Sequence, residues 1–573
     1  MPLRCGGRVR DRRLTTVSES VPAKVMMRLP RKAFAITVVI CLSWAGLAIS
    51  LTSPKILGLY HDDALYVISS KSLAEGKGYR IISLPEEPLQ TKYPILFPLL
   101  LAPVWLIQPS FPENIPYFQS IIICCGVAFL YLSQLFFLNV LKLNLSASTI
   151  VLSLLATSPI LLSVSQWVLT ELPYGTLTLF TLIYFESCYQ KNRSASVRQI
   201  ATLALFSASA YLIKSHGAVL ALAITGLLLL RRKLRDSLIF SLVTLTLVLP
   251  WFAWVAANAQ PNLAPLTQHY TSYHDSFSKV QNWEELRQLG WMSLHNLRYL
   301  TWSVDYFFLP LLNVNKRGSY FLVSFIGLVG LWLISIRCSL LVGFYMIALI
   351  AVILLLPWHP LRHLIPAMPL LYGACGVSIF TLYRRLREQP GDSRLKWAGR
   401  EALKLTSALG LVLVFLGNAV LVAMAFRDKP LNFAPAHSQF WNRDVSWSGY
   451  QETIDWIRAN TDDNARLAAI HDVLYYLYSG RKGTLFWFHK PRTYFYPTME
   501  SAQPAVGDVK EVVKSLHQSR IQWLVREPAV TGSLFEKNAI DDLAVRIIES
   551  GYPKATLAFV SSDGGHLIYK LEW

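Results

Sequence analysis

Apolar stretches long enough to cross a lipid bilayer recur along most of this chain, and this feature restricts its fold more than any other. About 20 consecutive apolar residues span the ~30 Å hydrocarbon core as a helix. Charged residues make up only 16% of the 573-residue chain, whereas soluble domains carry about a quarter. We therefore predict a polytopic membrane protein that is mostly α-helical, and we exclude disordered, collagen-like and nucleic-acid-binding classes.

The apolar stretches follow a basic N-terminal tail, residues 1–32. The first stretch is longer than the ~7–15-residue apolar core of a secretory signal, which favours an uncleaved helix with its N-terminus in the cytoplasm. With about eleven spans, the chain ends on the outer side of the membrane. The predicted spans are 33–52, 117–138, 149–168, 172–189, 199–213, 216–230, 237–257, 320–336, 339–356, 366–383 and 405–426.

Residues 94–109 decide on which side of the membrane each later loop lies. This segment is apolar but short, and it contains four prolines. The later basic clusters share the cytoplasmic side with the N-terminal tail only if 94–109 does not cross. We therefore interpret 94–109 as an interfacial or re-entrant segment, which makes 53–116 and 258–319 external loops. The net charge of +19 is then explained by cytoplasmic loops on anionic lipid and needs no nucleic-acid partner.

The C-terminal part, residues 427–573, has the mixed pattern of a small α/β domain. A helical pattern over 450–460 is followed by strand-like runs that alternate with helical stretches near 507–517 and 536–550. Residues 561–565 (SSDGG) form a hairpin turn signal between the last two runs. The topology predicts that this domain is extracytoplasmic. The strand-like runs are Arg466–His471, Leu485–Phe488, Ile521–Val525, Ala555–Val560 and His566–Lys570.

Two adjacent carboxylates, Asp62 and Asp63, lie shortly after the first span and directly follow His61. At the boundary between bilayer and water, an aspartate can stay ionised and yet be partly desolvated. Such a group suits a general base or a metal ligand. A solvated loop or a helix cap is the alternative, because Asp is a favoured N-cap residue.

Three motifs follow one another in this external loop: residues 61–66 (HDDALY), 72–79 (SLAEGKGY) and 91–98 (TKYPILFP). In this order they resemble the first external loop of the GT-C superfamily of glycosyltransferases, in particular the protein O-mannosyltransferase and aminoarabinose transferase branch. Ile95 stands where the family has a second proline. The resemblance covers most of the membrane region and fades in the C-terminal domain.

The resemblance implies an inner-membrane enzyme that moves a sugar from a polyprenyl-phosphate carrier to an acceptor hydroxyl at the extracytoplasmic face. The anomeric centre is expected to invert. Asp62 matches the catalytic acid of the family, which implies that it is the base that removes the acceptor proton. Asp63 is expected to support the geometry or to bind substrate. The acceptor is a glycan, a lipid or a protein.

Glu171 is the second acidic candidate and begins a predicted span. An acidic group at a membrane boundary is costly unless water or a partner stabilises it. Glu171 matches a recurrent glutamate of the family at the start of this helix, which implies a role beside the acceptor or a metal. The alternative is a charge that only interacts favourably with the helix dipole.

A phosphate leaving group needs cations, and three basic residues are candidates. Lys214 lies in a very short external turn, against the positive-inside bias, where the family commonly has a basic residue implicated in holding the carrier phosphate. Snorkelling of Lys214 to lipid headgroups is the alternative. Arg362 suits two-point contact with phosphate, and His363 beside it replaces the usual tyrosine. Lys92 is the third candidate.

A divalent metal is possible but is not demanded by the implied reaction. His61, Asp62, Asp63 and Glu171 could in principle assemble a metal site from oxygen and nitrogen ligands. The phosphate on the sugar is already a good leaving group, however, so the chemistry can proceed without a metal. We predict no certain cofactor and keep this site as the alternative.

Two other classes of membrane protein compete with the enzyme. A secondary transporter or lipid flippase would carry ionisable residues near the bilayer midplane, in matching Gly- or Pro-broken helices, and no such pairing occurs in the sequence. A membrane anchor that displays the external domain is the third class. No glycine-rich phosphate loop followed by Lys-Ser or Lys-Thr occurs, which argues against nucleotide hydrolysis. The aromatic segment Trp283–Tyr306 is expected to help cover the carrier or the acceptor.

Overall fold

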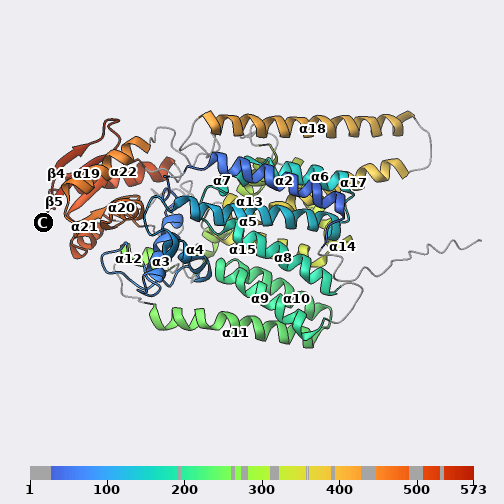
Figure 1. Ribbon diagram of the computed structural model, residues 1–573, viewed down its shortest axis with the longest axis horizontal. Helices are drawn as coiled ribbons and strands as arrows, with labels where there is room; N and C mark the ends of the chain where they lie inside the picture. The colour runs from blue at the N-terminus through green and yellow to red at the C-terminus, as the bar shows by residue number, and fades with distance from the viewer. Residues whose placement is uncertain are drawn as a thin grey trace, which may run out of the picture.

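The computed structural model describes residues 28–53, 55–189, 195–259, 265–272, 282–309, 322–356, 358, 360–388, 394–427, 447–488, 508–528 and 534–573. Most of the basic N-terminal tail, residues 1–27, lies outside these ranges. Figure 1 shows an elongated molecule in which long helices run side by side and the C-terminal sheet domain lies at one end. Three small helices lie at that same end: α3 (Asp62–Ala74), α4 (Leu96–Ile107) and α12 (Pro265–Thr271).

Within the described ranges, five helical segments are long and apolar enough to cross a membrane. They belong to α2 (Arg31–Leu51), α5 with η1 (Ile115–Leu135, Phe136–Val140), α11 (Leu234–Asn258), α16 to α17 (Pro360–Leu364, Met368–Glu388) and α18 (Arg394–Arg427). The shorter apolar helices are α4, α6 (Leu145–Ala156), α9 (Val197–Ile213), α10 (Gly217–Leu230), α14 (Leu322–Arg337) and α15 (Leu340–Leu355). These helices confirm a polytopic membrane protein, while the number of about eleven spans stays a prediction.

The outer surface of the bundle is apolar where a soluble protein would be polar. On α11, Leu238, Leu242, Leu245 and Leu249 are all more than half exposed. Their spacing of three and four residues places them on one face of the helix. A continuous exposed apolar face of this kind is unfavourable in water and favourable in hydrocarbon.

The predicted single span 149–168 is wrong. The chain forms two helices there, because α6 ends at Ala156 and α7 (Pro159–Val164) begins after a break. Ser158 has an extended backbone, with ψ at 122°. A residue before proline is disfavoured in the helical conformation, so Pro159 starts a new helix instead of continuing the old one.

The proline-rich segment 94–109 forms the short helix α4. Its 12 residues rise about 18 Å, which is less than the ~30 Å of hydrocarbon that a span must cross. The helix packs against α3, and the indole N–H of Trp105 donates to the carbonyl oxygen of Val67 at 3.1 Å. This length supports the interpretation of 94–109 as a segment that does not span the bilayer.

The second predicted external loop, 258–319, contains α12 and the long helix α13 (Trp283–Phe308). The aromatic segment predicted to cover a substrate is therefore a helix. The amide group of Asn296 donates to the carbonyl oxygens of Ile353 and Leu356, at 3.2 and 2.8 Å. These carbonyls lie at the end of α15, so α13 packs where that helix ends.

The C-terminal domain is a small α/β fold, as predicted. Its five strands have the order β2-β1-β3-β5-β4, in which β1 is parallel to β2 and β3, and β5 is antiparallel to β3 and β4. The predicted strand at Leu485–Phe488 is wrong, because β2 ends just before it and these residues are buried beyond the strand. The elements are α19 (Trp447–Asn460), β1 (Arg466–Ala468), α20 (Asp472–Ser479), β2 (Lys482–Thr484), α21 (Val509–Gln518), β3 (Trp523–Arg526), α22 (Leu534–Glu549), β4 (Lys554–Val560) and β5 (Leu567–Glu572).

The C-terminal domain contacts the first external loop directly. Helix α20, which the sequence did not predict, packs against α3. The hydroxyl of Tyr478 accepts the backbone N–H of Leu57 at 3.1 Å, and Nζ of Lys482 lies 2.7 Å from Oε1 of Glu87. The domain and the loop that carries the acidic pair therefore form one continuous structure.

A glycine is required where α20 approaches this loop, which gives a stability prediction. Gly58 has a φ of +105°, and a Cβ added to it would lie 3.1 Å from Cβ of Leu474. We expect Gly58→Ala to lower the free energy of unfolding by about 2–3 kcal/mol, through backbone strain and contact with α20 together. Gly76→Ala is the control, because Gly76 has a φ of +71° and nothing within 4 Å. Thermal unfolding in detergent should show a clearly smaller loss for Gly76→Ala, and equal losses would contradict the close contact.

Candidate functional site

The acidic pair lies where a tight turn enters α3. Asp63 is buried, and its carboxylate accepts the backbone N–H groups of Gly58 at 3.0 Å and of Ala64 at 2.9 Å. Burial raises the pKa of Asp63 to about 6, although the two N–H groups act in the opposite direction. This carboxylate holds the turn in shape, and a supporting role of Asp63 in the reaction stays a prediction.

Asp62 has different partners from Asp63. Its Oδ1 accepts the hydroxyl of Tyr93 at 2.6 Å, and its Oδ2 lies 2.8 Å from Nη1 of Arg362. Burial alone would raise the pKa of Asp62, but the charge of Arg362 and the Tyr93 hydroxyl outweigh it and lower the pKa to about 2. The side chain keeps 26% of its surface exposed, so this ionised carboxylate is accessible.

Glu171 is the first residue of α8 (Glu171–Tyr189), and its side chain is fully buried. Its Oε1 accepts Nζ of Lys214 at 2.9 Å and also Nε of Arg362. Arg362 therefore bridges two carboxylates, Asp62 and Glu171, that are far apart in the sequence. A buried carboxylate needs such partners, because an unpaired charge in this environment would be very costly.

Lys214 directly follows α9 and lies in the short turn before α10. The turn is closed by a hydrogen bond from the N–H of Gly217 to the carbonyl oxygen of Lys214, at 2.8 Å. The Lys214 side chain is only 11% exposed. Burial lowers its pKa, and the neighbouring Glu171 partly offsets this effect. The ion pair with Glu171 argues against a lysine that extends to lipid headgroups.

Lys92 approaches the same site from the first external loop. Its Nζ donates to the carbonyl oxygen of His269 at 2.8 Å, which links the loop to α12. Burial lowers the pKa of Lys92 to about 8, and the charge of Asp62 acts against this shift. Lys92 therefore adds a third cation whose charge acts on Asp62, beside Arg362 and Lys214.

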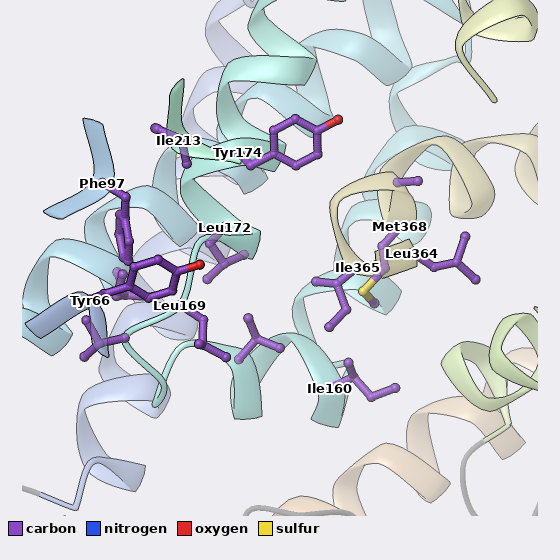
Figure 2. Close-up of a cluster of buried hydrophobic side chains, with 14 of the residues drawn as sticks. Tyr66, Phe97, Ile160, Leu169, Leu172, Tyr174, Ile213, Leu364, Ile365 and Met368 are labelled. Atoms are coloured by element: carbon purple, nitrogen blue, oxygen red, sulfur yellow. The ribbon is translucent and has the colours of Figure 1, made fainter. Parts of the chain in front are cut away.

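Apolar packing fixes the backbone segments that carry these charges. Each of the residues Asp62, Glu171, Lys214 and Arg362 has a buried apolar neighbour within one helical turn of the chain. Figure 2 shows these neighbours among the buried hydrophobic side chains, namely Tyr66, Leu172, Ile213 and Leu364. Because interiors are close-packed, the positions of the charged groups are set by this apolar cluster.

The structure does not bring the proposed metal ligands together. Nε2 of His61 lies 3.6 Å from Oδ1 of Asp472 in the C-terminal domain, while Asp62 and Glu171 contact Arg362. Among the described residues, no three His, Cys, Asp or Glu side chains are placed to hold a metal ion. The set His61, Asp62 and Glu171 does not fit a metal in this arrangement.

Three contacts near the site were not predicted from the sequence. Tyr93 lies within one of the motifs, yet no role was assigned to it, and His216 and His363 stack with ring centroids 4.9 Å apart. His216 is two residues from Lys214 and His363 is next to Arg362, so the stack joins the two segments that carry these cations. The third contact is Asp472 beside His61. The only sequence signal for a role of Tyr93 is its place among the motif residues. No local sequence signal indicates a role for Asp472.

Comparison with solved structures shows the fold. No protein-family model matches the chain, and no curated protein matches it in sequence. ArnT from Cupriavidus metallidurans has a TM-score of 0.54 in the apo state and 0.51 when bound to undecaprenyl phosphate, at 12% identity over 94% of this chain and 97% of that chain. The apo Archaeoglobus fulgidus oligosaccharyltransferase has a TM-score of 0.52 at 12% identity, over 94% of this chain and 74% of that chain. The chain therefore has a GT-C-like fold, as predicted.

The bridging role of Arg362 gives a second stability prediction. Arg362→Gln leaves two carboxylates without their shared cation, and we expect a loss of up to about 3–5 kcal/mol in the free energy of unfolding. Adding Glu171→Gln should recover part of this loss, because the buried charge is removed as well. Arg526→Gln is the control, since Arg526 pairs with Asp541 at the surface and should cost about 1 kcal/mol or less. Thermal unfolding measures the stability loss of each variant. Additive losses in the double variant would contradict the bridge.

Proposed function

We propose that the protein is a membrane glycosyltransferase that moves a sugar from a polyprenyl-phosphate-linked donor to an acceptor hydroxyl. The observation that carries this proposal is the convergence of a carboxylate with an exposed edge, Asp62, and the cations Arg362 and Lys214 on one site. A direct displacement on a sugar phosphate requires a base beside a pair of cations that can bind the phosphate.

The reaction follows from these groups. The acceptor oxygen attacks the anomeric carbon and its proton passes to Asp62, while the bond between that carbon and the phosphate oxygen breaks. The bonding electrons stay on the phosphate, whose charge grows from about −1 to −2 as the phosphodiester becomes a monoester. Arg362 and Lys214 therefore hold the leaving group more strongly than the donor, which lowers the barrier. A single displacement inverts the anomeric centre.

The ion pairs also predict an order of binding. Asp62 is a weak base while Arg362 holds it, because the cation stabilises the ionised carboxylate. A donor phosphate that binds Arg362 and Lys214 competes with Asp62 and Glu171 for these cations. The weaker pairing then raises the basicity of Asp62 at the moment when the sugar is in place. We therefore infer that the donor binds before the acceptor is activated.

The donor class and the orientation have separate support. The ArnT structure with a similar fold holds undecaprenyl phosphate, which supports a polyprenyl-phosphate donor here. Lys214 precedes α10, and the basic run Arg231 to Lys233 follows it at the opposite end of the helix. With that run on the cytoplasmic side, the site and the C-terminal domain face the extracytoplasmic side. We propose this orientation, with the cytoplasmic N-terminus, in the cell inner membrane.

The transporter alternative is less well supported. It requires ionisable groups near the middle of the membrane helices, whereas the groups at this site lie at helix ends and in loops. Asp62 and Glu171 begin helices, and Lys214 follows one. Uptake of the polyprenyl-linked sugar into reconstituted vesicles, without transfer to an acceptor, would favour the transporter.

The direct test uses the purified protein in nanodiscs with a panel of polyprenyl-phosphate sugars and with glycan, lipid and protein acceptors. We expect transfer by the wild type and a loss of about 10²–10⁴-fold for Asp62→Asn, because general base catalysis is removed. Asp462→Asn, at an exposed aspartate of the C-terminal domain, should transfer at the wild-type rate. Full transfer by a correctly folded Asp62→Asn variant would remove Asp62 as the base.

The lowered pKa of Lys92 predicts a pH limit on donor binding. Lys92 is charged below about pH 8 and loses its charge as the pH rises through that value. We expect the affinity for undecaprenyl phosphate to fall above about pH 8 in the wild type, and Lys92→Arg to retain affinity to higher pH, because arginine keeps its charge. Lys71→Arg, at a lysine beside Trp105, is the control. Identical pH curves for Lys92→Arg and the wild type would show that Lys92 does not act on the phosphate.

A further inference from the structure

The backbone just before Asp62 is strained. His61 has a φ of 62° and a ψ of −56°, and the N–H of Asp62 donates to the carbonyl oxygen of Tyr60 at 2.6 Å. These values describe a γ-turn of the rare, positive-φ type, centred on His61. A residue other than glycine holds such a conformation only where its surroundings impose it, and strain of this kind occurs most often at functional sites.

The C-terminal domain supplies a contact that can hold this turn. Nε2 of His61 lies 3.6 Å from Oδ1 of Asp472, whose side chain is fully buried. The ring of Tyr270 packs 5.3 Å from the imidazole, and the charge of Asp472 helps burial to raise the pKa of Tyr270 well above its ordinary value. A buried carboxylate needs a positive or hydrogen-bonding partner. Both the hydroxyl of Tyr270 and the imidazole of His61 face Asp472, and Nε2 of His61 lies within salt-bridge distance of it.

Asp472 is itself held in place by the packing of α20. It is the first residue of that helix, where the helix dipole favours a negative charge. Leu474 of the same helix contacts Gly58 in the turn before the acidic pair, and α20 as a whole packs against α3. The packing of α20 therefore holds the Asp472 carboxylate in one position, as a mobile loop would not.

We propose that Asp472 is a positioning residue, which holds the imidazole of His61 and through this turn directs the carboxylate of Asp62 at Tyr93 and Arg362. This inference rests on the proposed function of Asp62 as the base. The C-terminal domain then contributes a residue to the reaction site as well as forming a fold of its own. A displacement of about 1 Å at a reacting group can cost on the order of a hundredfold in rate, so a distant contact that sets the direction of Asp62 has a measurable effect.

The test separates positioning from simple docking of the domain. We expect Asp472→Asn to lower kcat about tenfold to a hundredfold and to leave KM for the donor within about twofold, because Arg362 and Lys214 are unchanged. Lys482→Gln is the matched control, since it breaks another contact of the domain with the same loop, the ion pair with Glu87. We expect wild-type kcat for this control. An equal fall in kcat for both variants would show that docking alone matters.

A double-mutant cycle tests the route through His61. If Asp472 acts through the imidazole, His61→Gln lowers kcat by a similar factor, and the double variant is no slower than either single variant. Effects that multiply in the double variant would overturn the proposal. His61→Gln also tests the link from the loop side if Asp472→Asn does not fold.

A measurement without substrate keeps this inference distinct from the proposed function. We expect amide hydrogen exchange in residues 57–64 to become about tenfold faster in Asp472→Asn and to stay at the wild-type rate in Lys482→Gln. Unchanged exchange in Asp472→Asn would overturn the positioning role, whether or not the enzyme transfers sugar. Faster exchange in a protein that transfers no sugar from any donor would retain the positioning role and reject the proposed function.

Discussion

The guanidinium of Arg362 joins three parts of the molecule, and the arrangement of the site depends on it. It contacts Asp62 at the start of α3 and Glu171 at the start of α8, and it comes from the segment between α15 and α17. Glu171 is fully buried and also pairs with Lys214 after α9. Because buried charges must be paired, the ends of these helices can come together in few ways. The apolar cluster around them then fixes the distances.

The same charges explain why the site suits chemistry on a phosphate. The carboxylates pair with cations whose burial at a helix boundary would otherwise be too costly. A phosphate is negatively charged like a carboxylate and has a similar geometry, so it can bind the same cations. Asp62 differs from Glu171 in that part of its side chain is exposed. One carboxylate is thus available to a substrate, while the other keeps Lys214 and Arg362 together.

The sequence predicted the residues of this site better than it predicted their partners. The sequence places Asp62, Glu171, Lys214 and Arg362 in motifs or at the ends of predicted helices, and the structure brings all four together. The errors have local causes: Pro159 divides an apolar stretch that reads as one span. The apolar run Leu485–Phe488 is buried without being a strand, because hydrophobicity indicates burial more reliably than it indicates secondary structure.

The sequence by itself determined that the chain is built of membrane helices with a small α/β domain after them. Apolar length, turn residues and charge placement are local properties, and they act on the chain wherever it folds. Only the tertiary structure decided that Asp63 supports the turn while Asp62 faces the cations, and that Asp472 reaches His61 from the C-terminal domain. Asp472 and His61 are some four hundred residues apart, and no local pattern encodes which of many carboxylates packs against one imidazole, since that depends on the docking of whole elements.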